Sequence, residues 1–584
     1  MGPPLHPARP QPIDATTLRA LVAELRAALL PSRFEKAQQP DGQTLQLALR
    51  HLGGLQWLEL SWLAEAPRLL AIPPPPRQGE GSTLASQVQH GLRGLALVDL
   101  HQRDWERVVR FTFAPRPGEA PQRHLVLELM GRHSNLFLLN ADERVIALAR
   151  QVRPAQSRWR PIGTGDLYSP PPPLRGEIPR STEPRDRWQR RLLTVPLPLG
   201  DALLQTYQGL SPALVRQLLE APPEGGEPLP PDRLVGQLEA RDWERLWGRW
   251  QVWLKAVEEE RFSLRWDGEG GCRCWGAEDW PAKDVTASRG PATQATAPAP
   301  LVLNNALARI SQAWLEARHL ERRRDALRHR LSGLERRERR QLAEQEALLV
   351  VASDSDTLQQ QADALLCLPS PNKEQIQEAQ TLYKRARRQR RSLAAIQPRL
   401  EAHRQRLAWL EEAQVFVDQA EQADSLAALE EDLGRLEPRG RSIARDAARP
   451  RSRGDTTAEA PAPLVLRSPS GLALQVGRNH RQNEWISLRQ SRRGDLWFHA
   501  QELPGSHVVL KASAGAASEA DLEAAADLAA HFSRGRGNAR VPVVMVPVEA
   551  LQRLPGAEAG TVRHRGGQIL WGQPDRARSL LMGS

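Results

Sequence analysis

Cysteine is scarce in this chain of 584 residues, which has Cys272, Cys274 and Cys367 and no others. An odd set of three cannot form a disulfide framework. Cys272 and Cys274 also lack the second pair that a structural zinc site requires. We therefore expect reduced thiols, no metal site and no cofactor.

Long apolar runs are missing as well. The first residues, MGPPLHPARPQPIDATT, contain neither the apolar core nor the cleavage site of a signal peptide. No run approaches the roughly 20 apolar residues that span a bilayer. These absences predict a cytoplasmic protein that is neither secreted nor embedded in a membrane.

The charge balance points to a polyanionic partner. Lys and Arg number 80 against 69 Asp and Glu, which gives a net charge of +11 and a pI near 10.3. Such a surplus suits nucleic-acid binding, although arginine used for solubility explains it equally well. The length predicts about four folded units at about 150 residues each.

The N-terminal half shows two patterns. Residues 1–190 contain an amphipathic helix that starts near Asp14, followed by short alternating segments such as TLQLALR, RVVRFTF and HLVLELM. They predict an α+β domain with an antiparallel sheet. Residues 191–280 predict a helical domain in which Gly209-Leu210-Ser211 joins two short helices. That turn either directs backbone amides at a phosphate or serves helix packing alone.

Residues 301–436 predict a long coiled coil, after a linker at 281–300. The apolar stripe has heptad spacing in both halves, and the break between Ser353 and Asn372 favours an antiparallel pair. Basic runs lie on both arms and serve either as a solvated face or as phosphate contacts. The stripe residues are Leu320, Leu327, Leu331 and Leu334, then Leu393, Ile396, Leu400, Leu407 and Leu410.

Residues 462–584 follow a second linker and predict a small α+β domain rich in polar and aromatic side chains. Arginine and asparagine bond phosphates and base edges, and aromatic rings stack on unpaired bases. Trp497 and Phe498 fit a core equally well, and His499 and His507 have no carboxylate partners at metal-ligand spacing. The two motifs are GRNHRQNEWISLR, from Gly477, and DLWFHAQELPGSHVVLK, from Asp495 to Lys511.

These two motifs closely resemble the C-terminal RNA-binding domain of the NFACT family of ribosome quality-control proteins. Glu128–Asn135, ELMGRHSN, resembles a segment of the family's N-terminal domain, and Ala379–Lys384, AQTLYK, resembles the start of its second coiled-coil arm. The match covers essentially the whole chain. It implies an NFACT-N domain, a helix-hairpin-helix-like domain, an antiparallel coiled coil and an NFACT-R domain, which together make a multidomain α+β protein.

The resemblance implies a function in rescue of stalled ribosomes. Family members bind rRNA and tRNA on a large ribosomal subunit that carries a stalled peptidyl-tRNA. Bacterial members recruit alanyl-tRNA, so that alanine is added to the nascent chain without mRNA. Peptidyl transfer belongs to the ribosome, so the chain is expected to position tRNA rather than to act as an enzyme. No membrane or DNA partner is expected.

The resemblance also assigns residues. Asp14 matches an aspartate before the first helix, which from local sequence is equally a helix N-cap, and Glu106-Arg107 matches an Asp-Arg pair required for tailing. Trp497 is expected to pack the C-terminal domain, and Arg478 and Arg481 to touch RNA. The remaining assignments are Glu128, Met130, Gly131 and Arg132 for tRNA and tailing; Asn479, Asn483, His499, Ser506, His507 and Lys511 for RNA; and Lys384, Arg385 and Arg388 for the ribosome.

Two departures from the family pattern bear on the activity. Glutamate replaces aspartate at Glu106, which retains a carboxylate on a longer side chain that can still orient an arginine. At 553–557 the chain has RLPGA where many relatives have KPKGA. A tRNA or ribosome binder without tailing is therefore the main alternative. Two other functions are less favoured. The chain lacks the N-terminal catalytic dipeptide of a DNA glycosylase, and it shows no export route for a surface adhesin.

Overall fold

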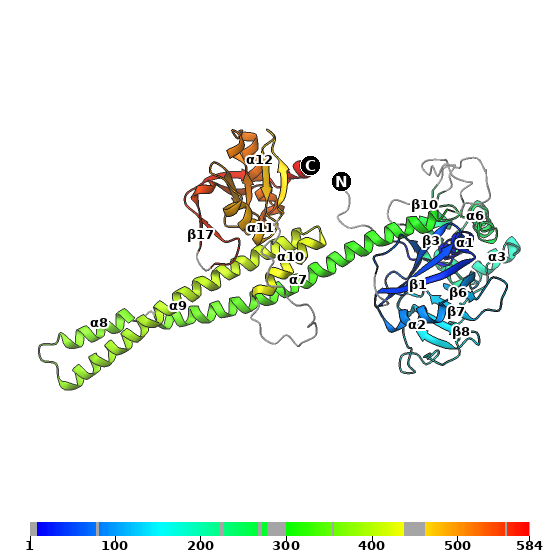
Figure 1. Ribbon diagram of the computed structural model, residues 1–584, viewed down its shortest axis with the longest axis horizontal. Helices are drawn as coiled ribbons and strands as arrows, with labels where there is room; N and C mark the ends of the chain where they lie inside the picture. Colours follow the sequence, from blue (N-terminus) through cyan, green and yellow to red (C-terminus); the bar gives the residue numbers. More distant parts are fainter. Residues whose placement is uncertain are drawn as a thin grey trace. The chain divides into compact units, whose positions relative to one another are not determined.

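The computed structural model describes residues 9–77, 81–221, 227–266, 271–276, 300–352, 355–436, 462–554 and 557–582. The chain forms two compact units, Met1–Ala317 and Arg318–Ser584. Their elements are labelled in Figure 1. Both expected linkers, and Pro555 and Gly556 of the RLPGA segment, lie largely or wholly outside the described residues.

A nine-stranded antiparallel sheet forms the centre of the first unit, as the alternating segments predict. Its strand order is β4-β3-β2-β1-β5-β6-β7-β8-β9. The strands are β1 (Ser32–Asp41), β2 (Thr44–His51), β3 (Gly54–Ser61), β4 (Arg68–Ile72), β5 (Ala96–Gln102), β6 (Val108–Ala114), β7 (Arg123–Glu128), β8 (Asn135–Asn140) and β9 (Val145–Leu148).

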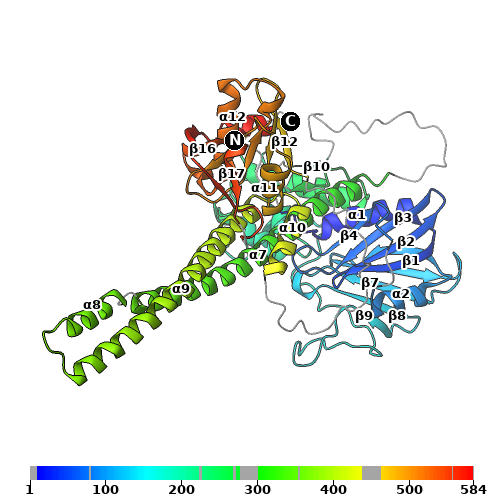
Figure 2. The ribbon, with the colours of Figure 1, turned by 60° about the vertical axis from the view of Figure 1, so that its left-hand side comes forward.

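The two faces of this sheet are covered differently. Helices α1 (Ala15–Leu29) and α2 (Thr83–Leu92) pack on one face, where Leu21, Leu138 and their neighbours form the main core; Figure 2 shows the strands with both helices labelled. Because successive side chains of a strand alternate, Phe137 points to the other face. There it meets Tyr168 edge to face at 5.3 Å, in a smaller core.

Helices follow the sheet as predicted, and they pack around tryptophans. Trp188, Trp250 and Trp253 are buried together with Tyr207. Trp253 also meets Trp105, in the turn between β5 and β6, at 5.3 Å, and these helices and the sheet form one compact unit. The elements are α3 (Arg185–Leu193), α4 (Leu199–Thr206), α5 (Pro212–Leu219), η2 (Val235–Gln237), α6 (Ala240–Glu258), β10 (Arg265–Trp266) and β11 (Cys272–Arg273).

The predicted antiparallel coiled coil is confirmed. Helix α7 (Val302–Ala352) begins in the first unit, where Asn304 bonds Glu24, and continues into the second. Within the second unit α7 runs beside α9 (Lys373–Gln419) (Figure 1). Ion pairs join residue 328 to 418 and 339 to 411, so the numbers rise along one helix as they fall along the other. Leu327, Leu331 and Leu410 share one core.

The ends of the coiled coil differ from the expectation. Instead of a plain break, residues 355–366 form a further helix, α8 (Ser355–Leu366), which pairs with α9 through Asp356 and Arg390 at 3.1 Å. The second arm is also not continuous to 436, because α9 ends at Gln419 and α10 (Ala423–Leu436) follows as a separate helix. Apolar spacing marks a helical stretch but not the short turns inside it.

The C-terminal α+β domain has a six-stranded antiparallel sheet in the order β12-β13-β15-β14-β16-β19. Alanine-rich α12 (Glu519–His531) packs on one face of it. The strands are β12 (Leu464–Arg467), β13 (Ala473–Val476), β14 (Leu496–Ala500), β15 (Val508–Leu510), β16 (Val541–Pro547) and β19 (Gln568–Gly572), with a separate pair β17 (Leu551–Arg553) and β18 (Val562–His564).

A short helical segment lies on the other face of this sheet. Helix α11 (His480–Glu484) continues into a π-helical turn, η4 (Trp485–Arg489), whose Ile486 packs with Trp497. The remaining elements are η5 (Ala512–Ala514), η6 (Arg534–Gly537), η7 (Val548–Ala550) and α13 (Ala577–Met582). None of the helices in the described ranges has the length and apolarity to cross a membrane.

Candidate functional site

Asp14 caps the first helix and also reaches a second one. Its Oδ1 accepts a hydrogen bond from the Thr17 amide at 2.8 Å, which satisfies a free donor at the start of α1. Its Oδ2 accepts from the Ser211 hydroxyl at 2.6 Å, at the start of α5. The capping role is therefore present, and one carboxylate ties the helical hairpin to the sheet domain.

Arg107 lies in the field of this carboxylate. Arg107 is the last residue of the turn between β5 and β6. Its backbone carbonyl accepts a hydrogen bond from the Leu129 amide at 2.8 Å. Burial lowers the pKa of its guanidinium, whereas the charge of Asp14 acts to raise it. Among the described residues its side chain has no hydrogen bond and no carboxylate within 4 Å. A half-buried cation in this state is suited to an anionic partner.

Glu106 does not pair with Arg107, contrary to the expected orienting role. Its carboxylate lies 3.9 Å from Arg103, and its buried Oε2 lacks a hydrogen-bond partner among the described residues. Burial raises the pKa of Glu106, and Arg103 partly opposes that shift. In this structure the cation nearest to the Glu106 carboxylate is therefore Arg103 and not Arg107.

The turn that carries this pair is locked into the helical part. Gly209 has φ +74°, and a Cβ on it would lie 2.8 Å from the Trp105 ring. Arg19 of α1 holds the same turn by donating to Gln102 and to the Asp104 carbonyl. The Gly209 turn therefore serves packing, which is one of the two alternatives drawn from sequence.

Glu128 is 1% exposed and fully engaged. Both carboxylate oxygens accept from Arg160, at 2.9 and 2.5 Å, and Tyr168 donates to Oε1 at 2.9 Å. Burial, followed by the Glu128 charge, raises the pKa of Tyr168. Since Glu128 cannot reach a macromolecule in this arrangement, its contribution is to hold the 160–168 segment against the sheet.

The rest of this motif forms a tight exposed turn. Met130 is partly buried, and its amide donates to Ser134 at 2.8 Å. Gly131, at φ +58°, opens the turn η1 (Gly131–His133). Arg132 is exposed, and its carbonyl accepts from Arg150 at 2.6 Å. Of the four predicted residues here, Arg132 is the one presented to solvent.

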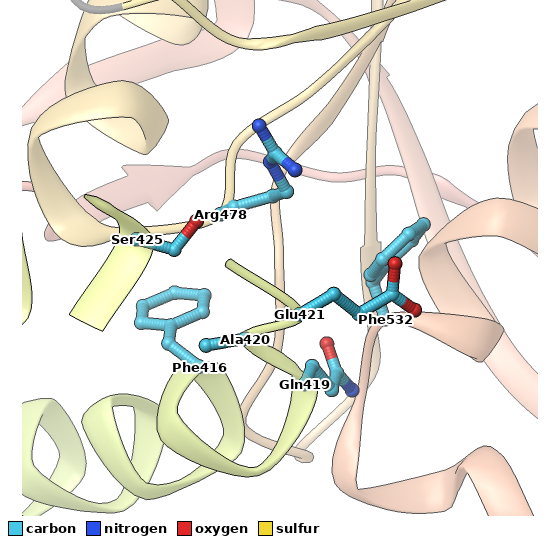
Figure 3. A pocket seen from close by; sticks show the side chains of 7 residues that line it. All are labelled: Phe416, Gln419, Ala420, Glu421, Ser425, Arg478 and Phe532. Carbon is cyan, nitrogen blue, oxygen red and sulfur yellow. The ribbon is translucent and has the colours of Figure 1, made fainter. Parts of the chain in front are cut away.

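In the second unit, the two arginines expected to touch RNA differ. Arg481 pairs with Glu431 and Asp432, both at 2.8 Å, so it fixes α11 to α10. Arg478 keeps a buried Nε that donates to no described residue. It lines a pocket of about 270 Å³, part of it open to solvent, with Phe416, Gln419, Ala420, Glu421, Ser425 and Phe532. Figure 3 shows its guanidinium directed away from the Phe416 ring.

Four other predicted RNA contacts are buried. Asn479 caps α11, and Asn483 accepts from the His507 amide at 3.1 Å. His507 shares a hydrogen bond of 2.8 Å with the Ser487 hydroxyl. Ser506 is buried, and its hydroxyl has no partner among the described residues. These residues shape the domain interior.

Trp497 is 2% exposed, which confirms its predicted packing role. His499 stacks on it at 5.6 Å, and His507 meets it edge to face at 5.0 Å. Burial lowers the pKa of both histidines. We call Trp497, His499 and His507 the ring cluster. No group of metal ligands occurs in the part of the chain that the structure describes.

The ends of the Asp495–Lys511 segment are joined to each other. Lys511 Nζ donates to Asp495 at 3.0 Å and to the Gln490 carbonyl at 3.0 Å. Burial raises the pKa of Asp495, but hydrogen bonds from Ser513, Arg492 and Lys511 outweigh it, and the net pKa is lowered. Lys511 is therefore occupied within the domain.

Three predicted cations of the second coiled-coil arm have no ion-pair partner among the described residues. Lys384, Arg385 and Arg388 are exposed on α9 and, within the described ranges, form no ion pair. Arg323 and Arg339 of α7 are instead paired with Glu430 and Glu411. Both alternatives drawn from sequence therefore occur among the described residues, because Arg390 of α9 is also paired, with Asp356 at 3.1 Å.

Family models match nearly the whole described chain. Residues 14–371 and 368–441 match the NFACT N-terminal and middle domains, and residues 464–566 match the NFACT protein RNA binding domain. The chain belongs to the NFACT family. The match to the NFACT RNA binding domain covers the six-stranded sheet except its edge strand β19.

Curated relatives align along their whole length. The chain is 24% identical over 599 residues to "Rqc2 homolog RqcH" of Streptococcus pneumoniae serotype 2, covering 97% of this chain and 99% of the relative. It is 21% identical over 596 residues to the protein of the same name from Bacillus subtilis, covering 96% and 98%. This end-to-end match agrees with the NFACT assignment.

Solved structures match parts of the NFACT chain. The C-terminal part of the fibronectin/fibrinogen-binding protein from Streptococcus suis has a TM-score of 0.37 and 24% identity, covering 45% of this chain and 98% of that one. The N-terminal part of the same protein has a TM-score of 0.33 and 23% identity, covering 41% and 84%.

Sequence reasoning missed several residues of the site. Ser211 bonds Asp14 across nearly 200 residues, and Arg160 reaches Glu128 across 32. Ser211 does carry a signal, because Ser-Pro marks a helix start, but nothing local indicates its second partner. The signal for Arg160 is weaker: its segment contains no acidic residue, so an ion-pair partner must come from elsewhere in the chain.

Proposed function

We propose that this NFACT protein binds a large ribosomal subunit carrying a stalled peptidyl-tRNA in the cytoplasm, and there positions a tRNA, specifically alanyl-tRNA, for tailing of the nascent chain without mRNA. It does so as a positioning factor rather than an enzyme. Peptide-bond formation is left to the ribosome.

The observation that carries this proposal is the state of Arg107. It is a half-buried guanidinium with no carboxylate within 4 Å among the described residues, on a turn fixed by Arg19, Trp105 and Leu129. Burying half of an unpaired cation costs desolvation energy that a bound phosphate returns. Such a group is suited to the backbone of a tRNA.

Two further features support the proposal. The chain contains an NFACT RNA-binding domain, and its relatives carry the name RqcH. The unpaired Lys384, Arg385 and Arg388 place positive charge along α9, where rRNA phosphates are suitable partners.

Glu106 favours a second candidate, a tRNA and ribosome binder without tailing. The carboxylate that the family places beside the arginine is directed to Arg103 here. A protein of this kind would bind tRNA but make no tails. Glu106→Asp shortens the side chain and tests this reading: tails made by the variant and not by the parent would favour the second candidate.

The decisive experiment is sequencing of the tRNA that co-purifies with the full chain on large subunits. We expect enrichment of alanine isoacceptors on subunits that retain nascent-chain tRNA. A random tRNA pool on those subunits would favour general binding, and no tRNA at all would refute the proposal.

A further inference from the structure

Trp159 is the most exposed tryptophan described in the first unit, at 92%. It lies in the loop 153–161, which is closed by a two-way backbone bridge between Val152 and Ile162 at 2.9–3.0 Å. A fully exposed indole costs hydration free energy in a free protein. Its display on a closed loop therefore suggests a binding partner.

The loop is rigidly attached at the residue next to Trp159. Arg160 is held by both oxygens of Glu128, and its Nε donates to the Ser169 carbonyl at 2.7 Å. The Arg160 guanidinium also lies over the Phe137 and Tyr168 rings, at 5.6 and 5.4 Å. Inside the loop, the amides of Gln156 and Ser157 donate to the Arg153 carbonyl. Trp159 is thus presented outward from a fixed base.

The surroundings of the indole are positively charged. From Arg144 to Gly165 the sequence has five arginines and no acidic residue. Arg153 and Arg158 are exposed and, among the described residues, form no ion pair. Arg150, two residues before the bridge at Val152, donates to the carbonyl of the exposed Arg132 at 2.6 Å. An aromatic ring among unpaired arginines is the combination that binds single-stranded nucleic acid by stacking and phosphate contact.

This surface also adjoins the Arg107 turn. The Leu129 amide, next to Glu128, donates to the Arg107 carbonyl at 2.8 Å. The charge of Glu128 raises the pKa of Glu106, and that of Arg160 lowers it. An RNA whose backbone lies at Arg107 therefore passes close to the base of the Trp159 loop.

We propose that Trp159 is a stacking platform for an unpaired base of the bound RNA, with Arg153 and Arg158 on the flanking phosphates, and that Glu128 is a positioning residue that holds this platform through Arg160. The proposal rests on the proposed tRNA binding. It gives the glutamate of the ELMG motif a role that its burial permits.

The test is titration of the full chain with a fluorescein-labelled alanine tRNA transcript at several salt concentrations. Trp159→Ala should weaken binding about 5- to 100-fold, and Trp159→Phe should stay within about threefold of the parent. The slope of the logarithm of the binding constant against the logarithm of the salt concentration should be unchanged by Trp159→Ala. The magnitude of this slope should decrease by about 0.7–0.9 for each of Arg153→Ala and Arg158→Ala. A control is Leu52→Ala, at 104% exposure, which removes an exposed apolar side chain of the same unit outside the loop.

The positioning role is tested by a double-mutant cycle. Because Glu128→Gln leaves the buried Arg160 without its carboxylate, Tyr168→Phe serves as the milder variant. In either background the effect of Trp159→Ala should shrink, since a loosely held loop no longer presents the ring. Independent, additive effects would overturn the role of Glu128.

The outcomes separate the two proposals. A parent chain that does not bind the transcript refutes both the function and the platform. A parent that binds, with Trp159→Ala binding equally well, overturns the platform alone, and would point to a protein partner at this loop.

Discussion

Arg107 and Arg481 are both half-buried arginines on RNA-binding candidates, yet their surroundings are opposite. Arg107 has no carboxylate within 4 Å among the described residues, whereas Arg481 bonds both Glu431 and Asp432. An unpaired cation keeps its capacity to bind an anion, and a doubly paired one has already used it. The residues that the family resemblance assigns are therefore of two kinds, some that face a partner and some that build the domain.

The sharpest test of this contrast is Arg107→Ala. Loss of a guanidinium that bonds phosphate should reduce tail synthesis about 10- to 100-fold in a reconstituted system. The unfolding temperature should not fall, because no described ion pair is broken. Arg116→Ala serves as the control, because Arg116 is an exposed arginine of the same unit with no ion pair among the described residues. Unchanged tail synthesis in Arg107→Ala would make this assignment wrong.

Arg481→Ala should show the reverse pattern. Removal of its bonds to α10 should destabilise the second unit by about 1–2 kcal/mol, after allowance for its partial exposure. Affinity for RNA, measured well below the unfolding temperature, should change by less than about threefold. A large loss of affinity without a change in stability would return Arg481 to the interface. Chemical denaturation and tRNA titration measure the two effects.

The ring cluster should make the second unit sensitive to acid. Burial lowers the pKa of His507 and His499 below the ordinary value of about 6.5. Above that pH the histidines are neutral in both the folded and the unfolded protein. Below it they take up protons in the unfolded chain first, so the folded state loses stability as the pH falls. The titratable groups that face the cluster are Glu412, His480 and His564. Burial lowers the pKa of His531 as well.

Hydrogen exchange of the β14 amides at pH 7.5 and 5.5 measures this loss. His499→Gln should reduce the difference between the two pH values by removing one of the titrating rings. Equal protection at both pH values in the parent chain would contradict the prediction.

Glu106→Gln should have the smallest effect, a stabilisation of up to about 1 kcal/mol at neutral pH. Burial raises the pKa of Glu106, so its charge opposes folding once the pH exceeds that raised value. The gain should disappear as pH falls through the raised pKa towards the ordinary value of about 4.3. Thermal unfolding of both proteins between pH 4 and 8 checks the sign; destabilisation at pH 7 would refute it.

Much of the fold follows from the sequence because its signals are local. Heptad spacing placed Leu327, Leu331 and Leu410 in one core, and strand alternation anticipated the first sheet. Contacts between distant residues left no such signal. The carboxylates that pair with Arg481 lie about 50 residues before it, and the second partner of Asp14, Ser211, lies nearly 200 residues after it. Burial, which separates Ser506 from Lys384, is likewise set by the whole domain.

The interlock of Gly209 with Trp105 bears on how this protein can be dissected. A fragment that stops near residue 190 keeps its nine strands but loses Ser211 from Asp14 and the Trp253 ring from Trp105. The exposed Trp105 indole would then favour aggregation, and the turn that carries Arg107 would lose the helices that pack against it. Inactivity of such a fragment would thus reveal nothing about which domain reads tRNA, so the roles of the parts are best separated by point substitutions in the intact chain.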